Sequence, residues 1–292
     1  MSAEEKVFDP KTYRLAAFDL DGTLLSGREP MHRPVSEALK ALSESGVTVI
    51  ASSGRNTTQL PNKLRSCFRY AVLSNGAMAM DVPTGRILFS HPIERLVALY
   101  AIDRIRKLGG TCFAQQGDHM ISPVSPLPAI LSECKKYTGS KRLSSMFALI
   151  GIYYGKSTVC RDPLKPAQKS EAPFYKLQAF FTDVSAAEKA AVPLRSETEL
   201  KVLVMSDGTL ELTAPGVSKA NALAELSAFL GLTEANIAAF GDSMNDAEML
   251  SRAGFSVAMQ NGDPRLFALT DRIAPPVQQD GAATMIRELW RL

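Results

Sequence analysis

Short apolar runs alternate along this chain with stretches whose apolar residues recur at helical spacing. Each run is short enough for a buried strand, and the runs cover residues 15–18, 47–51, 70–73 and 237–240. Residues 34–45 carry a helical stripe that includes Val35 and Leu39, and Gly46 stands where a helix often ends in a left-handed glycine. Strands that alternate with helices in this way predict βαβ units around a parallel sheet.

Each apolar run is followed directly by small polar or charged residues. Asp19 and Asp21 follow the first run, Ser53 and Gly54 follow the second, and residues 241–246 follow the run at 237–240. In a sheet of βαβ units the carboxyl ends of all parallel strands lie on one edge, which is where such proteins bind ligands. We therefore expect these polar clusters to converge.

The middle of the chain has a different texture. Helical patterns at 93–108 and 127–137 alternate there with strand-like runs at 111–115, 147–154 and 175–181, and the Lys-, Pro- and Ser-rich residues 155–173 predict an exposed loop. We interpret residues 91–193 as an inserted α+β domain. Residues 1–90 and 194–292 then form a doubly wound, mostly parallel Rossmann-like α/β core, to which we assign the strand-like residues 200–205 and 209–212.

Composition limits the partners. The 292 residues carry a net charge of +3, which is too mild for a nucleic-acid-binding protein. Residues 1–11 are polar and do not resemble a secretory signal. The longest apolar run, residues 146–154, is too short to span a bilayer. We expect a soluble, cytoplasmic protein without membrane or nucleic-acid partners; the sequence leaves the oligomeric state open.

The converging clusters contain more carboxylates than can stay charged together without a cation. The predicted site combines four acids with three hydrogen-bond donors: Asp19, Asp21, Asp242 and Asp246, with Lys219, Ser53 and Asn245. Mutual repulsion of the acids calls for a hard divalent cation, and Mg²⁺ suits a few carboxylates together with water and a substrate phosphate. Acids for a metal beside donors for an anion indicate phosphoryl transfer.

These residues occur in four ordered motifs that resemble those of the haloacid dehalogenase superfamily. The motifs are DLDGTLL at 19–25, SGR at 53–55, GVSK at 216–219 and GDSMND at 241–246. With SNGA at 74–77 and the insertion that follows, the chain is similar to the Cof-type branch, which carries a C2 cap. The motifs cover the whole core, whereas the cap is similar only in its position in the chain and in its alternation of helical and strand-like segments.

The resemblance implies a role for each matching residue. Asp19 would be the nucleophile that forms an aspartyl-phosphate, and Asp21 the general acid and base. The Asp19 carboxylate, the Asp21 backbone carbonyl and Asp242 would hold Mg²⁺, with Asp246 supporting them. The phosphoryl oxygens would be bound by Ser53, where the family usually has Thr, the Gly54 amide, Lys219 and Asn245. An acid at position 21 favours phosphate-ester hydrolysis, because the family's dehalogenases lack one there.

We therefore expect a Mg²⁺-dependent phosphatase, a phosphoric monoester hydrolase acting on a small phosphorylated metabolite such as a sugar phosphate. Two alternatives stay open: a phosphomutase or phosphotransferase that uses the same aspartyl-phosphate, and a non-catalytic sensor of a phosphorylated ligand. For Asp246 there is also a simpler reading, in which it is a first-turn acid that complements a helix dipole. The sequence does not identify the substrate or the cap residues that select it.

Overall fold

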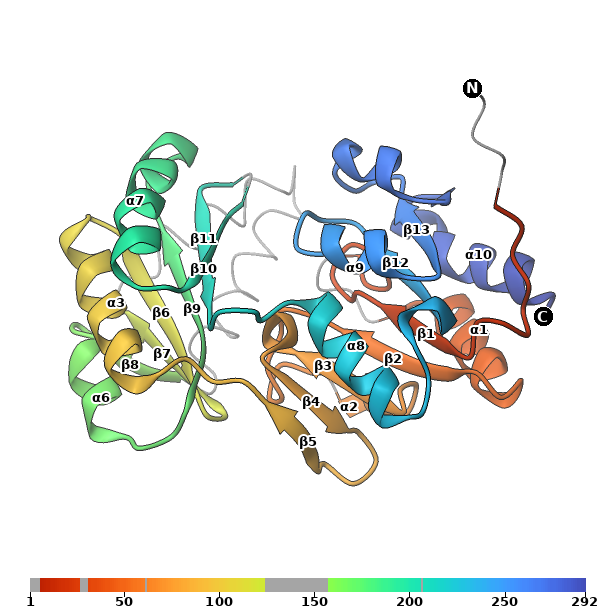
Figure 1. The fold of residues 1–292 in the computed structure, drawn as a ribbon, viewed down its shortest axis with the longest axis horizontal. Coiled ribbons are helices and arrows are strands. Elements are labelled where there is room, and N and C mark those ends of the chain that lie inside the picture. The colour runs from red at the N-terminus through yellow and green to blue at the C-terminus, as the bar shows by residue number, and fades with distance from the viewer. Residues whose placement is uncertain (1–5, 27–30, 61, 124–156, 206) are drawn as a thin grey trace. The chain divides into compact units, whose positions relative to one another are not determined.

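The computed structural model describes residues 6–26, 31–60, 62–123, 157–205 and 207–292. These residues divide into two compact units, which Figure 1 draws together. The first unit comprises Met1–Arg55, Leu60–Ser90 and Ser218–Leu292. The second comprises Asn56–Gln59 and His91–Val217. The two are described separately below.

Among its described residues, the first unit contains an eight-stranded sheet in the order β14-β13-β12-β1-β2-β3-β4-β5. Strands β14 to β3 in this order run parallel, and β4 and β5 form an antiparallel hairpin at the end of the sheet. The strands are β1 (Leu15–Phe18), β2 (Thr48–Ser52), β3 (Tyr70–Leu73), β4 (Met78–Asp81), β5 (Ile87–Ser90), β12 (Ile237–Gly241), β13 (Phe255–Met259) and β14 (Arg272–Ala274). The predicted doubly wound α/β class is confirmed.

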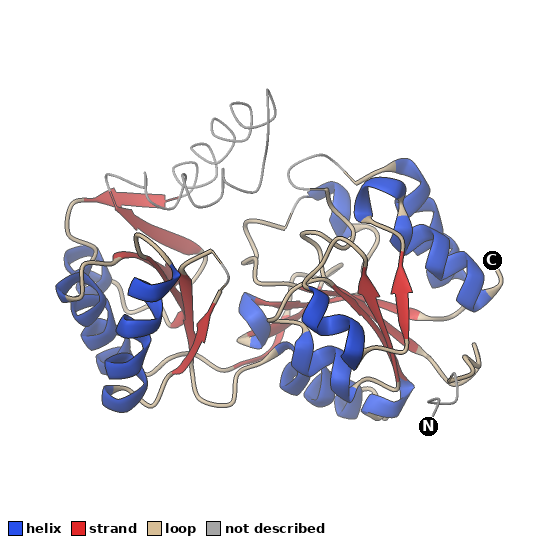
Figure 2. Cartoon of the chain, turned by 90° about the horizontal axis from the view of Figure 1, so that it is seen from above, coloured by secondary structure: helices blue, strands red, loops and turns tan. Residues whose placement is uncertain are grey.

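Helices lie on both faces of this sheet (Figure 2). Helix α1 packs on α10, and α8 packs on α9. Their bounds are α1 (Arg33–Glu44), α2 (Asn62–Arg65), α8 (Lys219–Phe229), α9 (Ala247–Arg252) and α10 (Gly281–Trp290), and the short 3₁₀ turns are η1 (Ser74–Gly76), η2 (Glu234–Asn236), η3 (Pro264–Leu269) and η4 (Val277–Gln279).

The alternation of side chains along β1 determines the face of the sheet toward which Asp19 is directed. Leu15 and Ala17 are buried in the same cluster as Leu223 of α8 and Met249 of α9. Because successive strand residues point to opposite faces, Asp19 continues the row of Leu15 and Ala17. The first acid of the motif is therefore directed toward the side of the sheet where α8 begins.

The second unit contains, among its described residues, a mixed six-stranded sheet in the order β10-β11-β9-β6-β7-β8. Helices α3 and α7 pack against this sheet. The elements are β6 (Thr111–Gln116), β7 (His119–Pro123), β8 (Ser157–Cys160), β9 (Phe174–Phe180), β10 (Lys201–Val204) and β11 (Thr209–Thr213), with α3 (Arg95–Lys107), α6 (Leu164–Lys169) and α7 (Val184–Glu197).

Two expectations about the insertion were wrong. We assigned residues 200–205 and 209–212 to the core, but β11 pairs with β9 and β10 with β11, so the second unit reaches Val217 and not residue 193. Residues 155–173 were expected to be a loop, yet they include β8 and α6. The helix expected at 127–137 and the strand at 147–154 lie outside the described residues. Within the described part of the chain, no helix is both long and apolar enough to cross a membrane.

Candidate active site

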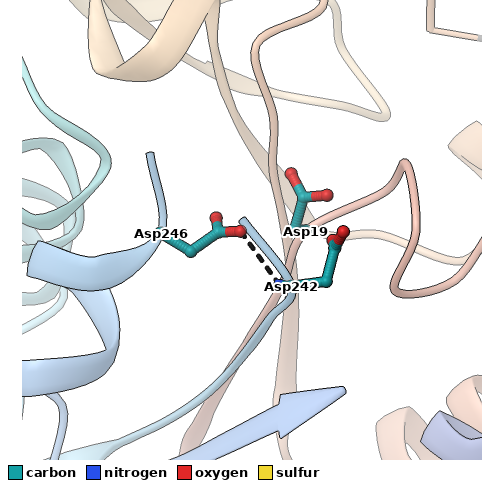
Figure 3. Close-up of side chains that lie close together, drawn as sticks. All are labelled: Asp19, Asp242 and Asp246. Carbon is teal, nitrogen blue, oxygen red and sulfur yellow. Dashed lines mark hydrogen bonds between the residues drawn. The ribbon is translucent and has the colours of Figure 1, made fainter. Parts of the chain in front are cut away.

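Asp19 and Asp242 meet because the strands that precede them are neighbours. Strand β1 pairs in parallel with β12 so that Phe18 lies opposite Phe240, and the Asp19 amide donates to the Phe240 carbonyl at 2.9 Å. The next residue after each strand therefore emerges at the same edge. One carboxylate oxygen from each of Asp19, Asp242 and Asp246 lies within 4.8 Å of the others (Figure 3).

Lys219 is the counter-charge of this cluster. Its Nζ lies 2.6 Å from Asp19 Oδ1 and 2.6 Å from Asp246 Oδ1, and its side chain is fully buried. Ser218 caps α8 by accepting a hydrogen bond from the Asn221 amide at 3.1 Å, which starts the helix at Lys219. The positive end of the helix dipole repels a cation at a helix N-terminus. The two carboxylates offset this repulsion for Lys219. Burial alone would lower the pKa of Lys219, but the charges of Asp19 and Asp246 outweigh it and raise the pKa.

Asp246 uses both of its oxygens to organise the site. Oδ1 accepts from Lys219, and Oδ2 accepts from the Ser243 backbone amide at 3.0 Å. Oδ2 also accepts from the Asp242 backbone amide at 3.1 Å (Figure 3). Its carboxylate does not cap α9, which follows it. The simpler reading, a first-turn acid that complements a helix dipole, leaves the contacts of Asp246 with Lys219 and with the Asp242 turn unexplained. Asp246 shapes the turn that presents Asp242.

Asp242 is held by residues to which the sequence had assigned no role. Its Oδ1 accepts a hydrogen bond from the Thr23 hydroxyl at 2.9 Å. Gly22 has φ +95°, and a Cβ there would lie 2.2 Å from Asp242 Oδ2. A Cβ on Gly262 would lie 2.4 Å from the Asp242 carbonyl oxygen. The two glycines are required because the backbone approaches Asp242 too closely for any side chain.

The Asp21 carboxylate lies outside the three-acid cluster. Its side chain is half exposed, and Arg55 binds both of its oxygens, with Nε 2.8 Å from Oδ2 and one terminal nitrogen 2.5 Å from Oδ1. The structure thus pairs Asp21 with Arg55, the last residue of the SGR motif, to which the sequence had assigned no role. The planar guanidinium of arginine is suited to such bidentate binding of a carboxylate.

The predicted phosphate-binding residues lie at the ends of neighbouring strands. Ser53 and Gly54 follow β2, and the buried Ser53 hydroxyl accepts from the Arg55 amide at 3.2 Å. Asn245 follows β12, and its Oδ1 accepts from the Ser243 hydroxyl at 2.5 Å. Strands β2 and β12 flank β1 on either side. The predicted site residues thus follow β1, β2 or β12 at one edge of the sheet, except for Lys219, which is the first residue of α8.

The donor set fits a hard divalent cation. Burial first, and then the charges of Asp19 and Asp246, raise the pKa of Asp242 well above its ordinary value. Burial likewise raises the pKa of Asp19 to about 7 although Lys219 opposes the shift. One ammonium is thus too little positive charge to keep the pKa values of Asp19 and Asp242 in their ordinary range. Carboxylate oxygens in this number are the ligands that Mg²⁺ prefers, and its charge would restore their ionised forms.

Comparison with known proteins identifies the family. A family model described as haloacid dehalogenase-like hydrolase matches residues 16–286. The chain belongs to this family. The match spans both units, and the four motifs of this hydrolase supply the residues of the edge described above.

Relatives agree with the assignment. The hydrolase is 28% identical over 258 residues to HMP-PP phosphatase of Cronobacter sakazakii, covering 87% of each chain. It is 26% identical over 284 residues to 5-amino-6-(5-phospho-D-ribitylamino)uracil phosphatase of Bacillus subtilis, covering 94% of this chain and 96% of that one. The predicted enzyme class, a phosphoric monoester hydrolase, is confirmed.

Solved structures share the fold over nearly the whole chain. A haloacid dehalogenase-like hydrolase from Bacillus subtilis gives a TM-score of 0.82 at 22% identity, covering 94% of this chain and 99% of that chain. A sugar phosphatase of subclass IIB gives a TM-score of 0.72 at 18% identity, covering 96% and 100%. The resemblance to the Cof-type branch with a C2 cap is confirmed, and the second unit is that cap.

Proposed function

We propose that this hydrolase is a Mg²⁺-dependent phosphatase that cleaves the phosphate ester of a small metabolite, such as a sugar phosphate, through an aspartyl-phosphate on Asp19. The observation that carries the proposal is the contact of Lys219 with Asp19 inside the three-acid cluster. An ammonium 2.6 Å from a buried carboxylate favours the ionised form that a nucleophile needs. It also supplies positive charge where a phosphoryl group would arrive.

The reaction would take place in two steps. In the first, the Asp19 carboxylate attacks phosphorus, the bond from phosphorus to the ester oxygen breaks, and Asp21 gives its proton to the departing alkoxide. In the second, the Asp21 carboxylate takes a proton from water, which attacks the phosphorus of the aspartyl-phosphate. The bond between phosphorus and the Asp19 oxygen then breaks, which releases phosphate and restores the free carboxylate.

The remaining residues would bind and orient the phosphoryl group. Ser53 and the Gly54 backbone amide after β2, the Asn245 amide after β12 and Lys219 at the start of α8 would be the donors. The Asp19 carboxylate, the Asp21 backbone carbonyl and Asp242 would hold Mg²⁺, and Asp246 would keep Asp242 and Lys219 in place. When bound, the metal would offset the negative charge of the phosphoryl group.

Asp21 must leave Arg55 before it can donate a proton. Its side chain is half exposed, and an ion pair in contact with solvent contributes little free energy, so such a movement is inexpensive. Arg55 would thus keep Asp21 in a waiting position until an ester is bound.

The names of the relatives support a small substrate. HMP-PP phosphatase and the ribitylaminouracil phosphatase are named for small phosphorylated organic compounds, and a structural neighbour is described as a sugar phosphatase. These names share a phosphate group on a compact polar molecule. We propose the same class here.

A phosphate-release screen tests the proposal. Purified protein is incubated with sugar phosphates, nucleotides and cofactor phosphates, with Mg²⁺ or with EDTA, and released phosphate is measured. We expect Mg²⁺-dependent release from at least one sugar phosphate and none from the Asp19→Asn variant, whose carboxamide keeps the shape but is not a nucleophile. Activity retained by that variant would refute the aspartyl-phosphate, and transfer to a second substrate without release would indicate a phosphotransferase.

A further inference from the structure

The turn that follows β3 has an unusual backbone. Ser74, Asn75 and Gly76 have φ values of 54°, 59° and 100°, so three successive residues are in the left-handed region. Two of the three carry side chains, for which this region is unfavourable. Such conformations persist where the surroundings enforce them, and they are common at functional sites.

Two neighbouring segments hold this turn in place. The amide of Ser74 donates to the Arg55 carbonyl at 2.9 Å, and the amide of Asn75 donates to the Ser53 carbonyl at 3.1 Å. On its other side, a Cβ on Gly76 would lie 2.1 Å from the Ser218 carbonyl oxygen. The turn is thus wedged between the SGR motif and the start of the helix that carries Lys219.

The side chain of Asn75 reaches a third segment of the site. It is 8% exposed, and its Oδ1 accepts from Nδ2 of Asn245 at 3.4 Å. At the other end of the Asn245 amide, Oδ1 accepts from the Ser243 hydroxyl. The amide plane of Asn245 is therefore held at both ends. A carboxamide nitrogen carries two hydrogens, so one stays available to a ligand after the contact with Asn75.

We propose that Asn75 is a positioning residue that orients the Asn245 amide toward a phosphoryl oxygen, and that its left-handed backbone exists to deliver this contact. The proposal rests on the proposed function, in which Asn245 binds the phosphoryl group. The Asn75 side chain can contact Asn245 from the loop after β3 because asparagine tolerates a left-handed conformation better than most residues do.

Replacing Asn75 by glycine distinguishes the contribution of its side chain from that of its left-handed backbone. Asn75→Gly keeps the left-handed turn and removes the unfavourable side-chain conformation, so we expect the melting temperature to stay the same or rise. Removal of the carboxamide should lower kcat/KM by about 10-fold, because loss of a group that orients a ligand-binding residue has this effect. The matched control is Ser74→Gly, which relieves the same strain one residue earlier and should leave kcat/KM within about two-fold of the wild type.

A double-mutant cycle decides whether Asn75 acts through Asn245. The wild type, Asn75→Gly, Asn245→Ala and the double variant are assayed with the best substrate of the phosphate-release screen. If Asn75 only positions Asn245, adding Asn75→Gly to Asn245→Ala changes kcat/KM by less than about two-fold. Equal losses in Ser74→Gly and Asn75→Gly, or independent losses in the cycle, would overturn the proposal. A wild type that releases no phosphate would instead refute the proposed function.

Discussion

Arg55, after β2, binds both carboxylate oxygens of Asp21, after β1, with contacts of 2.8 Å and 2.5 Å. The pair joins the SGR motif to the DLDGTLL motif. It gives the acid proposed to serve the leaving group a defined resting place at the edge of the site.

Replacing Arg55 by methionine should lower kcat by about 10-fold or more, because Asp21 would lose the partner that holds it in place until an ester binds. The free energy of unfolding should change by about 1 kcal/mol or less, since the side chain of Asp21 is half exposed. Steady-state kinetics and urea unfolding measure the two effects. As a control, Arg33→Met removes an arginine from an exposed pair with Glu37 and should leave kcat unchanged. An unaltered kcat in Arg55→Met would show that the pair is incidental.

Replacing Lys219 by methionine should abolish activity and lower the free energy of unfolding by about 3–5 kcal/mol, because Asp19 and Asp246 would stay buried without their counter-charge. Urea unfolding in EDTA measures the loss. Adding Asp246→Asn to Lys219→Met removes one of the two buried, uncompensated carboxylates. The double variant should recover part of the stability but not the activity. If the single variant is as stable as the wild type, the carboxylates are not charged together in the folded state.

Replacing Gly22 by alanine should raise the Mg²⁺ concentration needed for half-maximal activity, because its methyl group would displace the Asp242 carboxylate 2.2 Å away. The control is Gly46→Ala. Gly46 has a nearly equal φ of +92° with nothing within 4 Å of its Cβ, so it shares the backbone cost of about 1 kcal/mol without the collision. Titration of activity with Mg²⁺ separates the two variants. Equal Mg²⁺ dependence in both would contradict the role of Gly22.

The stabilisation given by Mg²⁺ should increase with pH. Burial raises the pKa of Asp19 from 3.8 to about 7 in the metal-free protein. Between these values the folded chain binds the proton that the unfolded chain has lost, so the free energy of unfolding falls as the pH rises. A bound cation favours the charged carboxylate and removes this loss. We therefore expect the rise in melting temperature on adding Mg²⁺ to be larger at about pH 7.5 than at about pH 5.

The control for this pH dependence is Asp19→Asn, which removes one of the two carboxylates, Asp19 and Asp242, whose pKa burial raises. Its response to Mg²⁺ should be smaller and should vary less between the two pH values. An equal Mg²⁺ effect at both pH values in the wild type would mean that Asp19 stays ionised in the metal-free protein.

Local patterns were enough to predict which side chains come together at the sheet edge. Asp19 and Asp242 each follow a short apolar run, and strand pairing in a parallel sheet brings such positions to one edge whichever helices lie between them. The same logic placed Ser53, Gly54 and Asn245. The family motifs then supplied Lys219, whose position on a helix would otherwise have suggested a surface residue.

Non-local contacts decided what the sequence could not. Strands β10 and β11 were recognisable by their composition, but a strand pattern does not specify its partner, and pairing with β9 placed them in the cap. Likewise, no spacing predicts that Arg55 meets the Asp21 carboxylate or that Asn75 reaches Asn245. These contacts depend on how the loops after different strands are directed once the sheet has formed. The sequence by itself determined which residues stand at the strand ends, because side-chain alternation and strand length are local properties; the tertiary structure decided which of them touch, because that depends on the packing of segments far apart in the chain.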